Sequence, residues 1–191
     1  RPSPFRVKVY EVSLFFVNCF CRFLHKLHCL RERHNPTMTM NFPQVGVVGA
    51  GAMGQGIAQV SVQAGSTVLL QDARAGAAQA AIEAIEAQWR NMSEKGRATS
   101  EQTSQWRKAL QVADDISELA QCTLVIEAIV EDRHAKHVLF EQLESVVAVD
   151  AVLASNTSSL SITELACGLR QPGRFCGFHF FNPVPLMKLV E

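Results

Sequence analysis

The sequence of residues 41–191 predicts an α/β fold of the Rossmann type, in which helices cover both faces of a doubly wound, mostly parallel sheet. Short apolar, β-branched runs alternate with longer stretches of helical periodicity along this region. A glycine-rich turn follows the first run, at residues 49–54. The run at residues 123–129 is largely apolar, which is typical of a central strand in a parallel sheet. We therefore expect residues 41–191 to form one domain.

The first half of this region contains two strand–helix units. Residues 44–48 form a short apolar run that is followed by Gly49, which predicts a buried strand. A helix is expected over residues 54–64, because a glycine follows as a stop signal. The second strand is expected at residues 67–70. The Ala-rich stretch at residues 75–92 carries its large apolar residues at helical spacing, which predicts a long helix.

The second half continues the alternation. A polar segment leads into a helix that carries Trp106 and Leu110. After the apolar run, residues 134–147 have the apolar spacing of a helix, and residues 152–154 form a short strand that ends in a cluster of hydroxyl side chains. The last two elements are expected to be a helix at residues 162–169 with Ser161 as its N-cap, and a strand at residues 174–180.

Composition excludes several function classes. The chain has 191 residues, a formal net charge of zero and 19% charged residues, so no electrostatic footprint for a nucleic acid is expected. Neither a membrane nor a nucleic acid is expected as a partner. Cys122, Cys167 and Cys176 lack paired spacing, which predicts reduced thiols in a reducing compartment.

Residues 1–40 differ from the rest and are expected to be a basic leader, disordered or not native to the protein. Residues 1–36 carry seven Lys or Arg and two acidic residues, and the apolar run at residues 12–20 is too short to span a bilayer. We expect a cytoplasmic protein, or a mitochondrial matrix protein if this segment is a presequence. The segment contains Cys19, Cys21, His25, His28 and Cys29. The spacing of these residues fits no common structural zinc pattern, so no metal is expected.

The glycine-rich turn has the G-x-G-x-x-G pattern of a dinucleotide-binding site, although a turn used only for packing is the alternative. Its residues are Gly49, Ala50, Gly51, Ala52, Met53 and Gly54. Because it joins a predicted strand to a predicted helix, it would present the helix N-terminus to a pyrophosphate. Asp72 ends the second strand and would accept hydrogen bonds from a ribose, which favours NAD over NADP. Arg74 weakens this preference.

Polar residues follow two later strands. Glu127 and Glu131 close the apolar run, where side chains face the ligand crevice of a parallel sheet or form an ordinary solvated strand end. The cluster at residues 155–159 can bind a substrate oxygen or a cofactor amide, or serve as a helix cap with turn residues.

His179 is the candidate general base. It lies among phenylalanines at the end of the last predicted strand, and Glu191 returns toward it after a turn that contains Asn182. A histidine in such a setting is either a core residue or a base with an orienting carboxylate, and the placement favours the base.

Four stretches resemble the N-terminal NAD-binding domain of the 3-hydroxyacyl-CoA dehydrogenase family, from about Val45 to Glu191. They are VGVVGAGAMGQGIAQV, VIEAIVEDRHAKHVLFEQL, LASNTSSLSITELA and GFHFFNPVPLMKLVE. The DARAGAA and EKGR segments look most like members that act in short-chain or dicarboxyl acyl-CoA degradation.

The resemblance implies NAD-dependent oxidation of L-3-hydroxyacyl-CoA to 3-ketoacyl-CoA, as in fatty-acid β-oxidation or related pathways. It implies that His179 is the base, that Glu191 orients it and that Ser158 hydrogen-bonds the reacting oxygen. It also implies cofactor contacts for Glu131, Lys136, Ser158 and Asn182, and a contact of Lys95 with the coenzyme A phosphates.

The family also has a helical C-terminal domain that forms a homodimer and completes the acyl-CoA site, and this domain is absent from the sequence. A homodimer is therefore expected for a full-length protein, while turnover by this chain is in question. Two alternatives stay open: a non-catalytic NAD-binding fragment or crystallin-like relative, and a β-hydroxyacid dehydrogenase with a lysine base.

Overall fold

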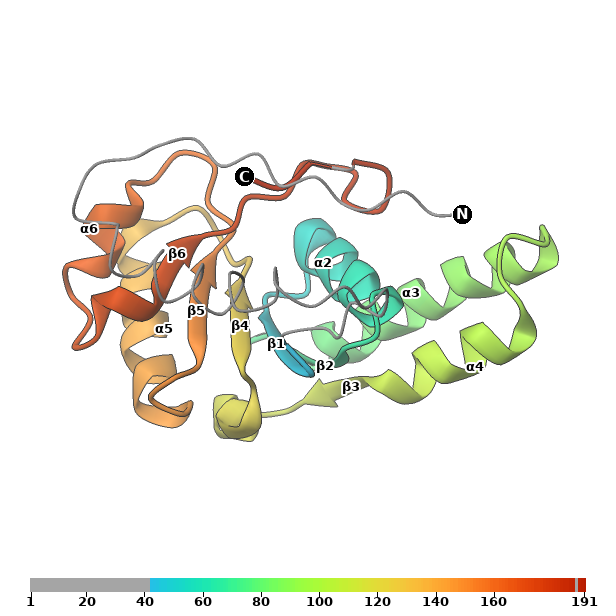
Figure 1. The fold of residues 1–191 in the computed structure, drawn as a ribbon, viewed down its shortest axis with the longest axis horizontal. Helices are drawn as coiled ribbons and strands as arrows, with labels where there is room; N and C mark the ends of the chain where they lie inside the picture. The colour runs from blue at the N-terminus through green and yellow to red at the C-terminus, as the bar shows by residue number, and fades with distance from the viewer. Residues whose placement is uncertain (1–41, 188) are drawn as a thin grey trace, which may run out of the picture.

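A computed structural model describes residues 42–187 and 189–191 and confirms the predicted fold class (Figure 1). Six strands form one sheet in the order β3-β2-β1-β4-β5-β6, and every neighbouring pair is parallel. The strands are β1 (Gln44–Val48), β2 (Thr67–Gln71), β3 (Leu110–Ala113), β4 (Leu124–Glu127), β5 (Val152–Ser155) and β6 (Phe175–Gly177). The expected leader lies outside the described residues.

The helices alternate with the strands. They are α2 (Ala52–Gln63), α3 (Ala77–Glu94), α4 (Ser100–Ala109), α5 (Arg133–Val146) and α6 (Ile162–Ala166), with 3₁₀ turns η1 (Ile116–Gln121) and η2 (Pro172–Arg174). Within the described part of the chain, we find no helix with both the length and the apolar character needed to cross a membrane.

Two apolar clusters sandwich the sheet. One joins the β1 residues Val45 and Val47 to Ile57 of α2 and Ile85 of α3. The other joins Val48 of β1 and Val125 of β4 to α5, α6 and η1. Because successive strand residues point to opposite faces, Val47 and Val48 belong to different clusters, as a doubly wound sheet requires.

Several element boundaries differ from the sequence predictions by one to three residues, among them the end of α6, which was expected at residue 169 and lies at Ala166. Leu110 was expected on a helix but begins the edge strand β3, which has only four residues and therefore too few to show a period of its own. The last strand was expected to reach residue 180 but β6 ends at Gly177. From His179 onward the backbone has other partners: the N–H of His179 donates to the carbonyl of Glu191, and the N–H of Phe180 donates to the side chain of Asn156.

Helices α3 and α4 form a hairpin that extends beyond the sheet (Figure 1). The rings of Trp89 and Trp106 pack with their centroids 5.6 Å apart, and Trp89 is fully buried. Thr99 caps α4 in a capping box with Gln102, which fixes the start of the returning helix.

Candidate functional site

The glycine turn between β1 and α2 has the geometry of an anion-binding loop. Gly49 has φ of 106°, and a Cβ there would lie 2.5 Å from the carbonyl oxygen of Ala128. A Cβ on Gly54 would lie 1.7 Å from the carbonyl oxygen of Gly49, so turn and helix pack without room for a side chain. Gly51, the N-cap of α2, would direct a Cβ into open space. The turn therefore leaves the N-terminus of α2 accessible and fits a pyrophosphate.

Asp72 follows β2 and lies against this turn. Its Oδ2 accepts a hydrogen bond from the backbone N–H of Ala50 at 2.8 Å. The guanidinium of Arg74 donates to both carboxylate oxygens, at 3.0 and 3.1 Å. The Arg74 hydrogen bond lowers the pKa of Asp72 to about 2, with a further contribution from the Ala50 N–H. A ribose bound here would share this carboxylate with Arg74.

The Asp72 carboxylate predicts a pH-dependent contribution to stability. Its folded-state pKa lies below the ordinary value of 3.8, so the stabilisation is complete above about pH 4 and is lost as the pH falls toward 2. Because Arg74 is largely exposed, we expect Asp72→Asn to cost about 1–2 kcal/mol at pH 7. Urea unfolding followed by circular dichroism at pH 7, 5, 4 and 2.5 should show this difference constant to pH 5 and then shrinking. A difference that stays constant to pH 2.5 would contradict this assignment.

A buried ion pair lies at the carboxyl ends of β4 and β5. Glu127 and Lys136 are both fully buried, and Lys136 Nζ donates to Glu127 Oε1 at 2.5 Å. The same oxygen accepts from the backbone N–H of Ile129 at 2.7 Å, and Ser155 Oγ donates to Oε2 at 2.6 Å. Glu127 is therefore part of a buried network and not the solvated strand end that the sequence left open.

Glu131 connects this network to the hydroxyl cluster after β5. Its Oε2 lies 3.2 Å from Lys136 Nζ, and its Oε1 accepts from the hydroxyl of Thr157 and from the hydroxyl of Ser159 at 3.0 Å. The backbone N–H of Ser158 donates to the same oxygen at 3.2 Å. Burial raises the pKa of Glu131, but the Thr157, Ser159 and Lys136 hydrogen bonds outweigh it and lower the pKa to about 2. The carboxylate thus holds the Ser158 turn in place.

His179 and Glu191 face each other across a short antiparallel pair. The N–H of His179 donates to the carbonyl of Glu191 at 2.8 Å, and the N–H of Glu191 donates to the carbonyl of His179 at 3.0 Å. The side chains are near each other, with 3.6 Å between His179 Nδ1 and Glu191 Oε2. This distance is longer than a hydrogen bond. The backbone therefore holds Glu191 beside His179.

A cavity of about 310 Å³ brings most of the predicted residues together. It lies between the glycine turn, the ends of β4 and β5, and the His179 segment. Its lining consists of Met53, Ala128, Ile129, Glu131, Lys136, Asn156, Ser158, His179, Phe180, Phe181 and Asn182. Asn156 was predicted only as one member of the 155–159 cluster, and its position directly after β5 was the signal. Its Oδ1 accepts from the Phe180 N–H at 2.8 Å and so fixes the backbone next to His179.

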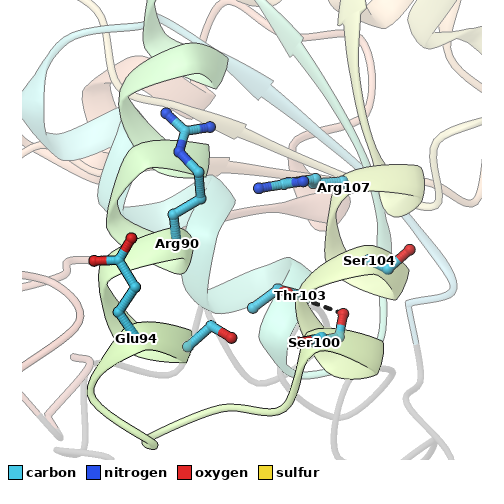
Figure 2. A pocket seen from close by; sticks show the side chains of 7 residues that line it. Arg90, Glu94, Ser100, Thr103, Ser104 and Arg107 are labelled. Carbon is cyan, nitrogen blue, oxygen red and sulfur yellow. Dashed lines mark hydrogen bonds between the residues drawn. The ribbon is translucent and has the colours of Figure 1, made fainter.

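Lys95 lies away from this cavity. It is the exposed C-cap residue of α3, beside a second hollow of about 300 Å³ between α3 and α4. Figure 2 shows Arg90 and Arg107 on facing helices of that hollow. Glu86 lies 3.8 Å from Arg90 and 4.0 Å from Arg107, so one carboxylate lies near both guanidinium groups. The two hollows share no lining residue among those described.

Comparison with known proteins gives a family match over the whole described domain. The family profile described as "3-hydroxyacyl-CoA dehydrogenase, NAD binding domain" matches residues 44–191. The 3-hydroxyadipyl-CoA dehydrogenase of Escherichia coli is 44% identical over 154 residues, which is 81% of this chain and 32% of that protein. The 3-hydroxybutyryl-CoA dehydrogenase of Bradyrhizobium diazoefficiens is 42% identical over 148 residues, which is 78% of this chain and 50% of that protein.

Solved structures agree with the sequence comparisons. A 3-hydroxybutyryl-CoA dehydrogenase from Escherichia coli superimposes with a TM-score of 0.77 at 43% identity, covering 79% of this chain and 32% of that one. The (S)-3-hydroxybutyryl-CoA dehydrogenase PaaH1 from Ralstonia eutropha superimposes with a TM-score of 0.76 at 35% identity, covering 78% and 53%. The chain spans about a third of the length of the two Escherichia coli proteins and about half the length of the other relatives named here. The matched family profile supports NAD as the cofactor.

Proposed function

This chain belongs to the 3-hydroxyacyl-CoA dehydrogenase family, and from that premise we propose that it oxidises an L-3-hydroxyacyl-CoA to the 3-ketoacyl-CoA. One observation carries the proposal: the His179 imidazole opens onto a cavity that also borders the glycine turn. Glu191 is held beside that imidazole by two backbone hydrogen bonds. A base and a nucleotide-binding turn around one cavity are suited to the oxidation of an alcohol. The base would take the hydroxyl proton, and the bound nucleotide would take the hydride from the same carbon.

The residues that would hold the cofactor come from the segments after β1, β2, β4 and β6 and from helix α5. The open N-terminus of α2 at Gly51 fits the pyrophosphate, and Asp72 lies beside the turn where a ribose hydroxyl would bind. Glu131, Lys136 and Asn182 line the cavity and would surround the nicotinamide end. NAD, when bound, supplies the acceptor for the hydride that leaves C3 of the substrate.

The proton chemistry falls to His179. A neutral imidazole nitrogen of His179 would accept the proton of the 3-hydroxyl as the carbonyl forms, and Glu191 would orient the ring and stabilise its protonated form. The 3.6 Å separation of the two side chains allows this contact to tighten when substrate is present. Ser158, whose backbone Glu131 holds, would donate a hydrogen bond to the reacting oxygen.

The test is the reduction of acetoacetyl-CoA, which is measured as the oxidation of NADH. The assay compares acetoacetyl-CoA with free acetoacetate, and NADH with NADPH. It uses both this chain and a hybrid that joins it to the remaining half of the Bradyrhizobium relative. We expect NADH oxidation that requires the CoA ester in the hybrid.

Each of the other outcomes points to a different function. If both proteins bind NADH without turnover, the non-catalytic NAD-binding alternative is supported. If free acetoacetate is preferred to acetoacetyl-CoA, the chain acts as a different hydroxyacid dehydrogenase.

A further inference from the structure

Gly56 lies on α2 two residues beyond the nucleotide fingerprint and packs directly against the loop that follows His179. A Cβ on Gly56 would lie 2.7 Å from Val184 Cβ and 3.0 Å from its Cγ2, with Pro185 Cδ at 3.5 Å. Both Gly56 and Val184 are buried. The Val184 side chain therefore occupies the space that any side chain at position 56 would need.

The segment seated on Gly56 connects the two members of the candidate catalytic pair. It leaves from His179, passes Val184, and returns through Val190 to Glu191, where Phe180 and Val190 form an antiparallel bridge. Phe180, Val184 and Val190 are buried in the same apolar cluster as α2. The position of this segment on α2 therefore sets where Glu191 meets His179.

We propose that Gly56 is a positioning residue for the His179–Glu191 pair, because the absence of its side chain lets Val184 seat the connecting segment on the nucleotide-binding helix. The same contact links the helix that faces the pyrophosphate to the segment that carries the base. Its catalytic consequence rests on the proposed function, whereas the packing itself does not.

Helix propensity and the packing at Gly56 predict opposite effects for Gly56→Ala, so the direction of the measured effect tests the inference. Glycine inside a helix is less favourable than alanine, so Gly56→Ala would stabilise α2 if nothing opposed the added methyl group. The geometry predicts that the methyl group displaces Val184 and loosens the pairing of His179 with Glu191.

The experiment measures amide hydrogen exchange of His179 and Glu191 by NMR in the 191-residue chain. We expect at least tenfold faster exchange of these two amides in Gly56→Ala. Gly173→Ala is the matched control, because a Cβ there meets no atom within 4 Å, and it should leave exchange unchanged. Unchanged or slower exchange in Gly56→Ala would overturn the proposal.

A second variant keeps the test decisive if Gly56→Ala folds poorly. Val184→Gly removes both the Cβ at 2.7 Å and the Cγ2 at 3.0 Å, so Gly56→Ala/Val184→Gly should exchange these amides no faster than Val184→Gly alone. Faster exchange in the double variant than in Val184→Gly would mean that the two positions are not complementary in space, and would overturn the proposal.

Activity gives a separate readout in the hybrid protein. There, Gly56→Ala should lower kcat for acetoacetyl-CoA at least tenfold and change the Kd for NADH less than twofold. An unchanged kcat would overturn the catalytic part of the proposal. A hybrid without any turnover would contradict the proposed function, while the exchange measurements would still decide the role of Gly56.

Discussion

Replacement of His179 by glutamine is expected to slow hydride transfer to acetoacetyl-CoA by about 10²–10⁴-fold, which is the usual contribution of a general acid or base. In this reductive direction, the protonated imidazole gives its proton to the forming alkoxide. Glutamine retains hydrogen-bonding capacity and approximate size but cannot carry that proton. Single-turnover oxidation of NADH in the hybrid protein measures the chemical step without product release.

The binding of NADH distinguishes a base from a binding residue. NADH affinity of the His179→Gln chain should stay within about twofold of the unmodified chain, since the general base acts on the substrate hydroxyl. The matched control is His134→Gln on α5, because His134 is exposed and does not line the cavity. Equal losses of NADH affinity and rate, or an equal rate loss in the control, would remove His179 from the role of base.

Replacement of Lys136 by methionine is expected to destabilise the fold by about 3–5 kcal/mol, because it leaves a buried carboxylate without its counter-charge. Glu127 is fully buried, and Lys136 provides its 2.5 Å ion pair. Urea unfolding followed by circular dichroism at pH 7 gives the free energy of unfolding. The double variant Glu127→Gln/Lys136→Met removes both charges and should recover a large part of the loss.

An exposed ion pair between the same helix, α5, and helix α6 provides the control. Arg133 lies 2.8 Å from Glu164, but their side chains are 65% and 54% exposed, so Arg133→Met should cost less than about 1 kcal/mol. If both methionine variants lost the same stability, burial would not be the reason for the Lys136 effect. A double variant no more stable than Lys136→Met would also count against an unpaired charge as the cause.

The sequence was most informative where local geometry decides the structure. The glycine turn and the position of Asp72 follow from a strand, a turn and a helix that are adjacent along the chain. The fold class was equally accessible, because alternating strand and helix patterns leave few topologies for a parallel sheet. The four-residue strand β3 was not predicted, since so short a segment has no recognisable period.

Long-range side-chain contacts were beyond the sequence. Glu127 could be a solvated strand end or a crevice residue, and only its contact with Lys136 across β4 and α5 resolves the choice. Asn156 holds the backbone of Phe180, which is 24 residues away, through a single side-chain oxygen. The spacing of apolar residues along the sequence carries no information about such a contact. The contact of Val184 with Gly56 is of the same kind, because it depends on how a loop returns to a helix.

The α3–α4 hairpin determines what intrinsic fluorescence can report about this protein. The chain has two tryptophans, Trp89 and Trp106, and they pack together in this hairpin, outside the cavity lined by His179. Tryptophan emission during refolding would therefore follow the docking of α3 on α4, the step that returns the chain from β2 to β3. Parallel strands β2 and β3 are joined through this crossover, so we expect its docking and their pairing to be coupled in folding. Circular dichroism follows the secondary structure of the whole domain. A difference between its time course and that of the emission would therefore show whether the β3 edge forms before or after the rest of the fold.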